Sequence, residues 1–133
     1  MPVELSMLLW TGLLCLVLAM PYVVGNIAQL GVPRLAGNRE DVPQLEGWIG
    51  RARRTHANHV ENLGPFAVLV LVAHAVGALD ATTAIASQVF LGARVAHAVT
   101  YLAGIPWVRT VAFGAGIVAE FVIAGRILAH AAG

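Results

Sequence analysis

One stretch decides the fold: it reads Arg51-Ala-Arg53-Arg54-Thr-His56-Ala-Asn58-His59-Val-Glu61-Asn62, and an uncharged apolar run over residues 62–79 follows it directly. At 100° per residue, four of its polar side chains fall within about 80° of one another on a helix: Arg51, Arg54, Asn58 and Glu61. On the same helix Arg53 and His59 point elsewhere. Charge at membrane depth is costly and persists where it faces a cavity, a partner or a ligand. The stretch therefore predicts a spanning helix that holds a polar molecule, with the arginines binding carboxylates and Glu61 an amine.

Composition supports a membrane protein. Of the 133 residues, 59% are hydrophobic and 11% are charged, whereas a soluble domain carries about 25% charged residues. The net charge of +1 gives no reason to expect a nucleic-acid partner. All eight basic residues are arginines. The single cysteine, Cys15, excludes a disulfide within the chain, and its apolar surroundings indicate a packing role.

Four stretches are long enough to cross a bilayer, because a spanning helix needs about 20 mostly apolar residues. Lipid leaves no backbone group unpaired, so each stretch is expected to be a helix. We expect spans over residues 5–30, 50–79, 81–103 and 106–131. The long connection, residues 33–49, is rich in proline and glycine. The sequence thus predicts an all-α fold, an integral membrane four-helix bundle formed by a single domain, residues 1–133.

The arginines also predict an orientation. Most lie in the long connection, at the start of the second span or at Arg109, and Arg126 alone lies toward the other side. The positive-inside rule then places residues 33–49 in the cytosol and both termini on the opposite side. The polar site of the second span would open toward the cytosol.

A second polar stripe lies in the third span. Arg94, His97 and Tyr101 are spaced i, i+3, i+7, within about 60° of one face of a helix. Arg109 and Thr110 then open the fourth span, where free backbone N–H groups and a guanidinium favour a developing anion. A thiolate held there would have a pKa lowered from about 8.5 toward neutrality.

Together these motifs resemble the MAPEG family, the membrane-associated proteins in eicosanoid and glutathione metabolism. The resemblance rests on the run from Arg51 to Phe66, on Arg94-x-x-His97-x-x-x-Tyr101 and on Arg109-Thr110, and it covers nearly the whole chain. It implies a homotrimer in the membrane, with glutathione bound between neighbouring protomers. By this resemblance, six residues match glutathione contacts: Arg54, Asn58, Glu61, Arg94, His97 and Tyr101. We add Arg51, from the same stripe, and the polar residues of the first span, Asn26 and Gln29, to the expected binding set.

The resemblance also implies the reaction. Arg109, assisted by Thr110 and by Asp41 of the long connection, matches the group that stabilises the thiolate. Ala57 and Phe113 depart from the eicosanoid-producing members, which carry a basic residue and a tyrosine there. The expected activity is therefore that of a bacterial-type glutathione transferase or peroxidase acting on lipophilic electrophiles, in the bacterial inner membrane.

Two other classes of function remain open at this point. A proton-coupled four-helix transporter would need a carboxylate inside the membrane, and Glu120 in the fourth span is a candidate. A non-catalytic scaffold would use the polar stripes for assembly alone. The pair His56 and His59 could bind a metal ion, but no further ligand completes a set, so no metal site is expected.

Overall fold

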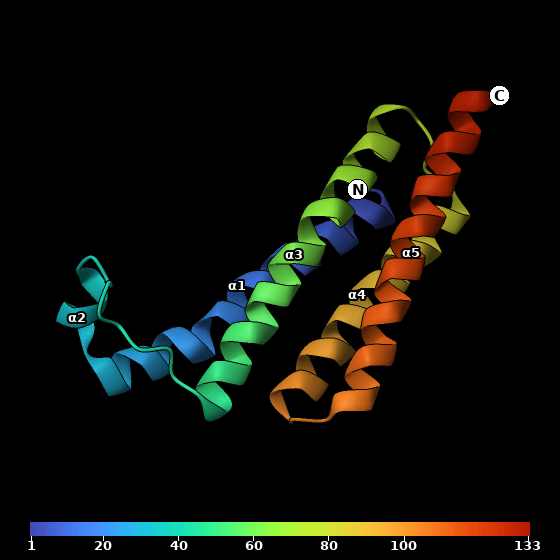
Figure 1. Ribbon diagram of the computed structural model, residues 1–133. Coiled ribbons are helices and arrows are strands. Elements are labelled where there is room, and N and C mark those ends of the chain that lie inside the picture. The colour runs from blue at the N-terminus through green and yellow to red at the C-terminus, as the bar shows by residue number, and fades with distance from the viewer.

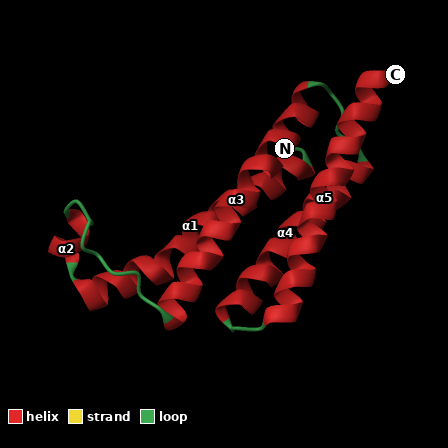
Figure 2. Cartoon of the chain, in the orientation of Figure 1, coloured by secondary structure: helices red, strands yellow, loops and turns green.

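The computed structural model describes residues 1–133 and is entirely helical, with green loops joining red helices and no strand in Figure 2. Four long helices and one short one follow in chain order: α1 (Val3–Leu30), α2 (Val32–Ala36), α3 (Gly47–Ala75), α4 (Ala81–Leu102) and α5 (Pro106–Ala132). At 1.5 Å per residue, the 22 residues of α4 extend for about 33 Å, which matches the thickness of a bilayer core.

The long helices pack as two antiparallel pairs. In Figure 1, α1 runs beside α3, α4 runs beside α5, and α2 projects from one end of the bundle. The α3–α4 turn lies at the same end as the C-terminus, and the α4–α5 turn lies at the opposite end. Both turns contain a glycine with positive φ, Gly77 (75°) and Gly104 (76°), a conformation that side chains with a Cβ rarely adopt.

The core lies where α3, α4 and α5 meet. The rings of Phe66 and Phe90 stack with centroids 3.9 Å apart, and neither ring is exposed. Small residues, Ala73, Ala86 and Ala119, complete the same cluster and let the backbones approach closely. This core fixes the rotation of α3, and therefore decides which of its polar side chains face the other helices.

The membrane-spanning expectation is met in part. Two helices, α1 and α5, are long and apolar enough to cross a membrane, with mean hydropathies of 2.1 and 1.9 over their most apolar segments. The other two long helices, α3 and α4, carry the polar stripes and contain no segment apolar enough to meet the same criterion of length and hydropathy. The all-helical fold is confirmed, while the four-span arrangement of the helices and the trimer stay proposals.

Candidate functional site

Arg94 is the centre of the polar interior. It lies in the middle of α4, and only 1% of its surface is exposed. Its Nη2 donates to Asn58 Oδ1 of α3 at 2.9 Å and lies 3.5 Å from His97 Nδ1 one turn further along α4. The arginine therefore ties together the two stripes that the sequence predicted, and it does so inside one chain.

His59 is also part of this cluster. Arg94 Nε donates to His59 Nδ1 at 3.4 Å, and His59 Nε2 lies 3.0 Å from the carbonyl oxygen of Thr11 in α1. Because a carbonyl only accepts, Nε2 carries the ring proton and Nδ1 is free to accept from the guanidinium. The prediction that His59 points away from the polar site is therefore wrong: the core residues of α3 turn His59 inward.

The cluster is incompletely paired. Arg94 Nη1 is buried and has no hydrogen-bond partner, and neither has Glu120 Oε1 on α5. The two side chains are close enough to interact electrostatically, but they form no ion pair. Gly116, one turn before Glu120, packs against Arg94: a Cβ at Gly116 would lie 3.9 Å from Arg94 Cδ, in ordinary van der Waals contact. A buried guanidinium with free N–H groups is a binding site for an anion.

Aromatic rings connect Arg94 to the start of α5. The centroid of the His97 ring lies 5.5 Å from that of Tyr101 and 6.4 Å from that of Phe113. Arg109 then lies over the Tyr101 ring, with Cζ 4.4 Å from the ring centroid, a cation–π contact. His97, Tyr101 and Arg109 thus form a continuous line from the buried cluster to the α4–α5 turn, as the sequence predicted. The next residue, Thr110, is exposed and donates to the carbonyl oxygen of Pro106.

The stripe on α3 divides into two parts. Arg51 and Asn58 are half-buried, and Arg51 Nε donates to the carbonyl oxygen of Leu102 at the end of α4. Arg54 and Glu61 are exposed on the surface of the chain. Arg54 lies 3.8 Å from Glu46, an exposed pair that contributes little to stability. Within one chain, therefore, half of the stripe contacts α4: Asn58 binds Arg94, and Arg51 binds the end of that helix.

Three predicted residues lie apart from the cluster. Asn26 of α1 lines a separate cavity of about 260 Å³ beneath the long connection, together with Arg53. Gln29 is exposed near the end of α1. Asp41 is exposed in the connection, its carbonyl oxygen accepts from Arg34, and its carboxylate forms no ion pair with Arg109 of α5. Within one chain these residues do not reach the site.

A second side-chain contact between α1 and α3 was missed by sequence reasoning. Cys15 Sγ lies 3.6 Å from His56 Nε2, and Tyr22 Oη lies 3.4 Å from His56 Nδ1. His56 and His59 therefore contact different partners and do not point toward a common ion. The i, i+7 spacing of Cys15 and Tyr22 on α1 was the available signal, but it acquires meaning only once α1 is known to pack on α3.

Taken together, the geometry defines an all-α protein that has two helices apolar enough to cross a membrane and a buried, cationic and incompletely paired cluster between its helices. The chain matches the MAPEG family over residues 7–129, and it belongs to that family.

Among curated proteins, it is similar to microsomal glutathione S-transferase 1 of Rattus norvegicus, with 35% identity over 81 residues. That alignment covers 60% of this chain and 52% of the relative, so the similarity spans about half of the relative's length. No solved structure matches the chain.

Proposed function

We propose that the chain is a glutathione-binding membrane enzyme, which activates the glutathione thiol for attack on lipophilic electrophiles or peroxides. Membership of the MAPEG family and the similarity to a glutathione S-transferase support a glutathione-related function. The observation that carries the proposal is the buried Arg94 guanidinium, whose Nη1 has no partner. A glutathione carboxylate would supply the missing acceptor and compensate the buried charge.

The length of the site suits this ligand. Arg94 and Tyr101 are seven residues apart on α4, a rise of about 10 Å. A tripeptide-sized molecule in extended form spans about the same distance. With a carboxylate near Arg94, the thiol of an extended glutathione would reach the neighbourhood of Tyr101 and Arg109.

Arg109 is the proposed thiolate-stabilising residue. Its guanidinium is held over Tyr101 and is half-buried at the start of α5. A cation beside the sulfur favours the thiolate, and therefore lowers the thiol pKa. The thiol proton leaves to solvent, the thiolate attacks the electrophilic carbon, and the displaced group leaves with the bonding electrons. With a hydroperoxide, the thiolate attacks the terminal oxygen and the O–O bond breaks, so glutathione sulfenic acid forms and the alkoxide takes up a proton and leaves as the alcohol. A second glutathione thiol then attacks the sulfenic sulfur, and glutathione disulfide and water are released.

The exposed half of the α3 stripe supports a site shared between copies of the chain. Arg54 and Glu61 lie on a face that also carries Val68 and Val72, so charge and apolar surface are exposed together at membrane depth. A second copy would bury that face and bring the remaining charges to the ligand. We therefore include a homotrimer in the proposal, with Asn26, Gln29, Asp41 and Thr110 as contributors to the assembled site.

The membrane arrangement belongs to the same proposal. All four long helices would span a bacterial inner membrane, with the α4–α5 turn and residues 33–49 on the cytosolic side and both termini opposite. Glutathione would enter from the cytosol, and the lipophilic substrate laterally from the lipid.

The test is turnover by the purified protein. In mild detergent with glutathione, we expect conjugate formation with an aromatic halide, or consumption of a lipid hydroperoxide, above the uncatalysed rate. An Arg126→Gln variant, altered at an arginine at the opposite end of the bundle from Arg109, is the matched control and should keep the activity. If the folded protein catalysed neither conjugation nor peroxide reduction in the presence of glutathione, the proposal would be contradicted.

A further inference from the structure

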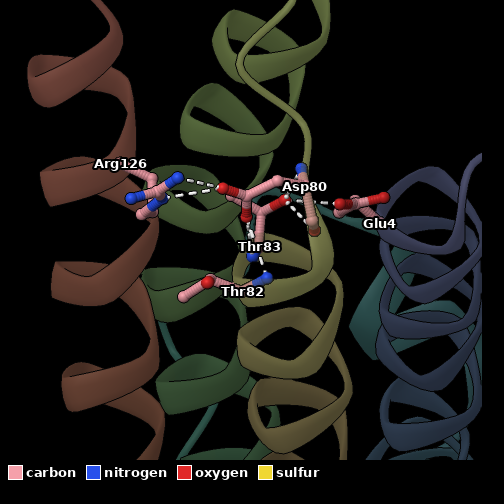
Figure 3. A network of polar contacts seen from close by, with 5 residues as sticks. All are labelled: Glu4, Asp80, Thr82, Thr83 and Arg126. Carbon is pink, nitrogen blue, oxygen red and sulfur yellow. Dashed lines mark hydrogen bonds and ion pairs between the residues drawn. The ribbon is translucent and has the colours of Figure 1, made fainter.

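A second polar centre lies at the opposite end of the bundle from Arg109, where α4 begins and α5 ends (Figure 3). Asp80 caps α4: its Oδ1 accepts from the backbone N–H groups of Thr82 and Thr83, at 2.8 and 3.0 Å. Its Oδ2 accepts from both Nε and Nη2 of Arg126 on α5. Both side chains of this ion pair are partly exposed: 31% of the Asp80 side chain and 49% of the Arg126 side chain are accessible to solvent.

The pair forms one wall of a polar cavity. The cavity measures about 360 Å³ and is lined by the α3–α4 turn, Asp80, Arg126 and His130. The carbonyl groups of Gly77, Ala78 and Leu79 in that turn accept no backbone hydrogen bond. Arg126 Nη1 is not engaged by Asp80 and keeps its N–H groups for another acceptor. The cavity therefore offers a cation for a phosphate group, and an anion with several carbonyls for an ammonium group.

A separate apolar groove lies further along α4 and α5, about one helical turn from the cavity. It measures about 270 Å³ and lies between α4 and α5, lined by Ile85 and Val89 on one side and Val118 and Val122 on the other. Val118, Val122 and Arg126 are spaced i, i+4, i+8 and share one face of α5. Thr82 supplies the polar lining at the end of the groove nearest Asp80.

The dimensions agree with one leaflet of a membrane. Arg126 lies 20 residues after Pro106, about 30 Å along α5, so it reaches the bilayer surface opposite the α4–α5 turn. From Arg126 to Val118 the helix descends about 12 Å, close to half the hydrocarbon thickness of about 30 Å. A charged pair at headgroup depth and an apolar groove below it match the two parts of a phospholipid.

We propose that the cavity at Asp80 and Arg126, together with the groove beside Ile85 and Val118, binds a phospholipid with a phosphoethanolamine headgroup. The phosphate lies against Arg126 and His130, and one acyl chain fills the groove. The primary ammonium donates to the turn carbonyls and lies beside the negative charge of Asp80, whose carboxylate oxygens are taken by Thr82, Thr83 and Arg126. Thr82 lies at the depth of the glycerol esters. The site is separate from the proposed glutathione site, and neither depends on the other.

The chemistry distinguishes headgroups. A choline headgroup has no N–H donor for the turn carbonyls. A glycerol headgroup has hydroxyl donors but no ammonium, so it places no positive charge beside Asp80. Phosphatidylethanolamine is therefore expected to bind about tenfold tighter than phosphatidylcholine or phosphatidylglycerol with the same acyl chains, the difference made by one charge-assisted hydrogen bond.

Native mass spectrometry of the full chain in mild detergent, titrated with these three dioleoyl lipids, tests the assignment. Arg126→Gln should remove the preference for phosphatidylethanolamine, while Arg34→Gln, an exposed arginine of α2, should keep it. Val118→Trp should fill the groove and lower the affinity for all three lipids about tenfold. This is the loss expected when the contacts of a few acyl methylene groups are removed. Val111→Trp, at an exposed valine outside the groove, is its control.

Asp80→Asn keeps the assignment testable if Arg126→Gln does not fold, because asparagine also caps helices. Without the carboxylate charge, the preference should shift from phosphatidylethanolamine toward phosphatidylglycerol. Equal binding of the three lipids, or an unchanged preference in Arg126→Gln or Asp80→Asn, would overturn the proposal. Loss of self-association in Val118→Trp with unchanged lipid binding would assign the groove to a second copy of the chain instead.

Discussion

The Arg94 cluster and the Asp80–Arg126 network contain similar groups but are completed differently. Asp80 has a partner for each carboxylate oxygen, two backbone N–H groups on one and Arg126 on the other (Figure 3). Arg94 is almost wholly buried, yet its Nη1 has no acceptor, and the nearby Glu120 has an oxygen without a donor. Unpaired polar groups are more costly in the interior than at the surface.

The difference separates a network whose hydrogen bonds are complete within the chain from one that leaves buried polar atoms unpaired. The Asp80 network closes on itself through the cap of α4, and Thr83 Oγ1 extends it to the buried Glu4 of α1 at 2.5 Å. It joins three helices. The Arg94 cluster also joins three helices, through Asn58, His59 and Thr11, but leaves N–H groups available. Burying unpaired N–H groups of Arg94 costs folding free energy. We propose that a bound ligand supplies the missing acceptor.

The largest expected effect is at Arg94. Arg94→Gln should abolish measurable glutathione binding and lower thermal stability, because it leaves Glu120 without a nearby cation and His59 Nδ1 without a donor. Losing one partner of a buried charged contact costs about 2–5 kcal/mol. Calorimetry and thermal unfolding in detergent check the two effects separately. Arg126→Gln, the corresponding change in the other network, should keep the wild-type affinity for glutathione. An equal loss of affinity in both variants would contradict the difference proposed between the two regions.

The exposed half of the α3 stripe sharpens the comparison. Arg54→Ala and Glu61→Ala should each weaken glutathione binding by about 2 kcal/mol if a neighbouring copy closes the site over them. Arg53→Ala should have little effect on binding, because Arg53 donates to Gln44 and lies beneath the long connection. A larger loss in Arg53→Ala than in Arg54→Ala would show that the ligand approaches α3 from a different face.

Arg109 should affect the chemistry more than the binding. Arg109→Ala removes the cation over Tyr101 but leaves the Arg94 cluster intact. We expect glutathione affinity to stay within a few-fold, and the pKa of the bound thiol to rise by about one unit, equivalent to about 1.4 kcal/mol. Turnover should fall at neutral pH and partly recover at higher pH. A low, flat pH–rate profile would assign thiolate stabilisation to another residue, with Tyr101 the next candidate.

The smallest effect concerns pH and the closed network. The N–H of Thr83, followed by Arg126, holds the pKa of Asp80 below its usual value. A lowered folded pKa stabilises the fold above the unfolded value of about 3.9, and this contribution is lost as the pH falls through the folded pKa. Melting temperatures measured from about pH 6 down to about pH 3 should therefore fall less in Asp80→Asn than in the wild type. Parallel curves for the two proteins would contradict the assignment to Asp80.

The helices and half of the site were predictable from the sequence. Apolar length and the breakers at Gly77 and Gly104 located the long helices, and the spacing of Arg94, His97 and Tyr101 correctly predicted one polar line on α4. His59 was misplaced because the centre of the α3 face was taken from its charged residues. The buried residues Phe66, Val70 and Ala73 set the actual face, and tracing them back by helical spacing reaches Asn62, His59 and Thr55.

Other features depended on how the helices pair. The contacts of His56 with Cys15 and Tyr22 and of Glu4 with Thr83 join residues 34 to 79 positions apart, and no local pattern predicts such pairs. The roles of Asn26, Gln29 and Asp41 depend further on contacts between copies of the chain, and they stay predictions.

Isothermal titration calorimetry of glutathione into the detergent-purified protein tests the central claim most directly. The account predicts saturable binding in the wild type, none detectable in Arg94→Gln, and wild-type affinity in Arg126→Gln. Heats indistinguishable from dilution for correctly folded wild-type protein, or equal affinity in wild type and Arg94→Gln, would contradict it.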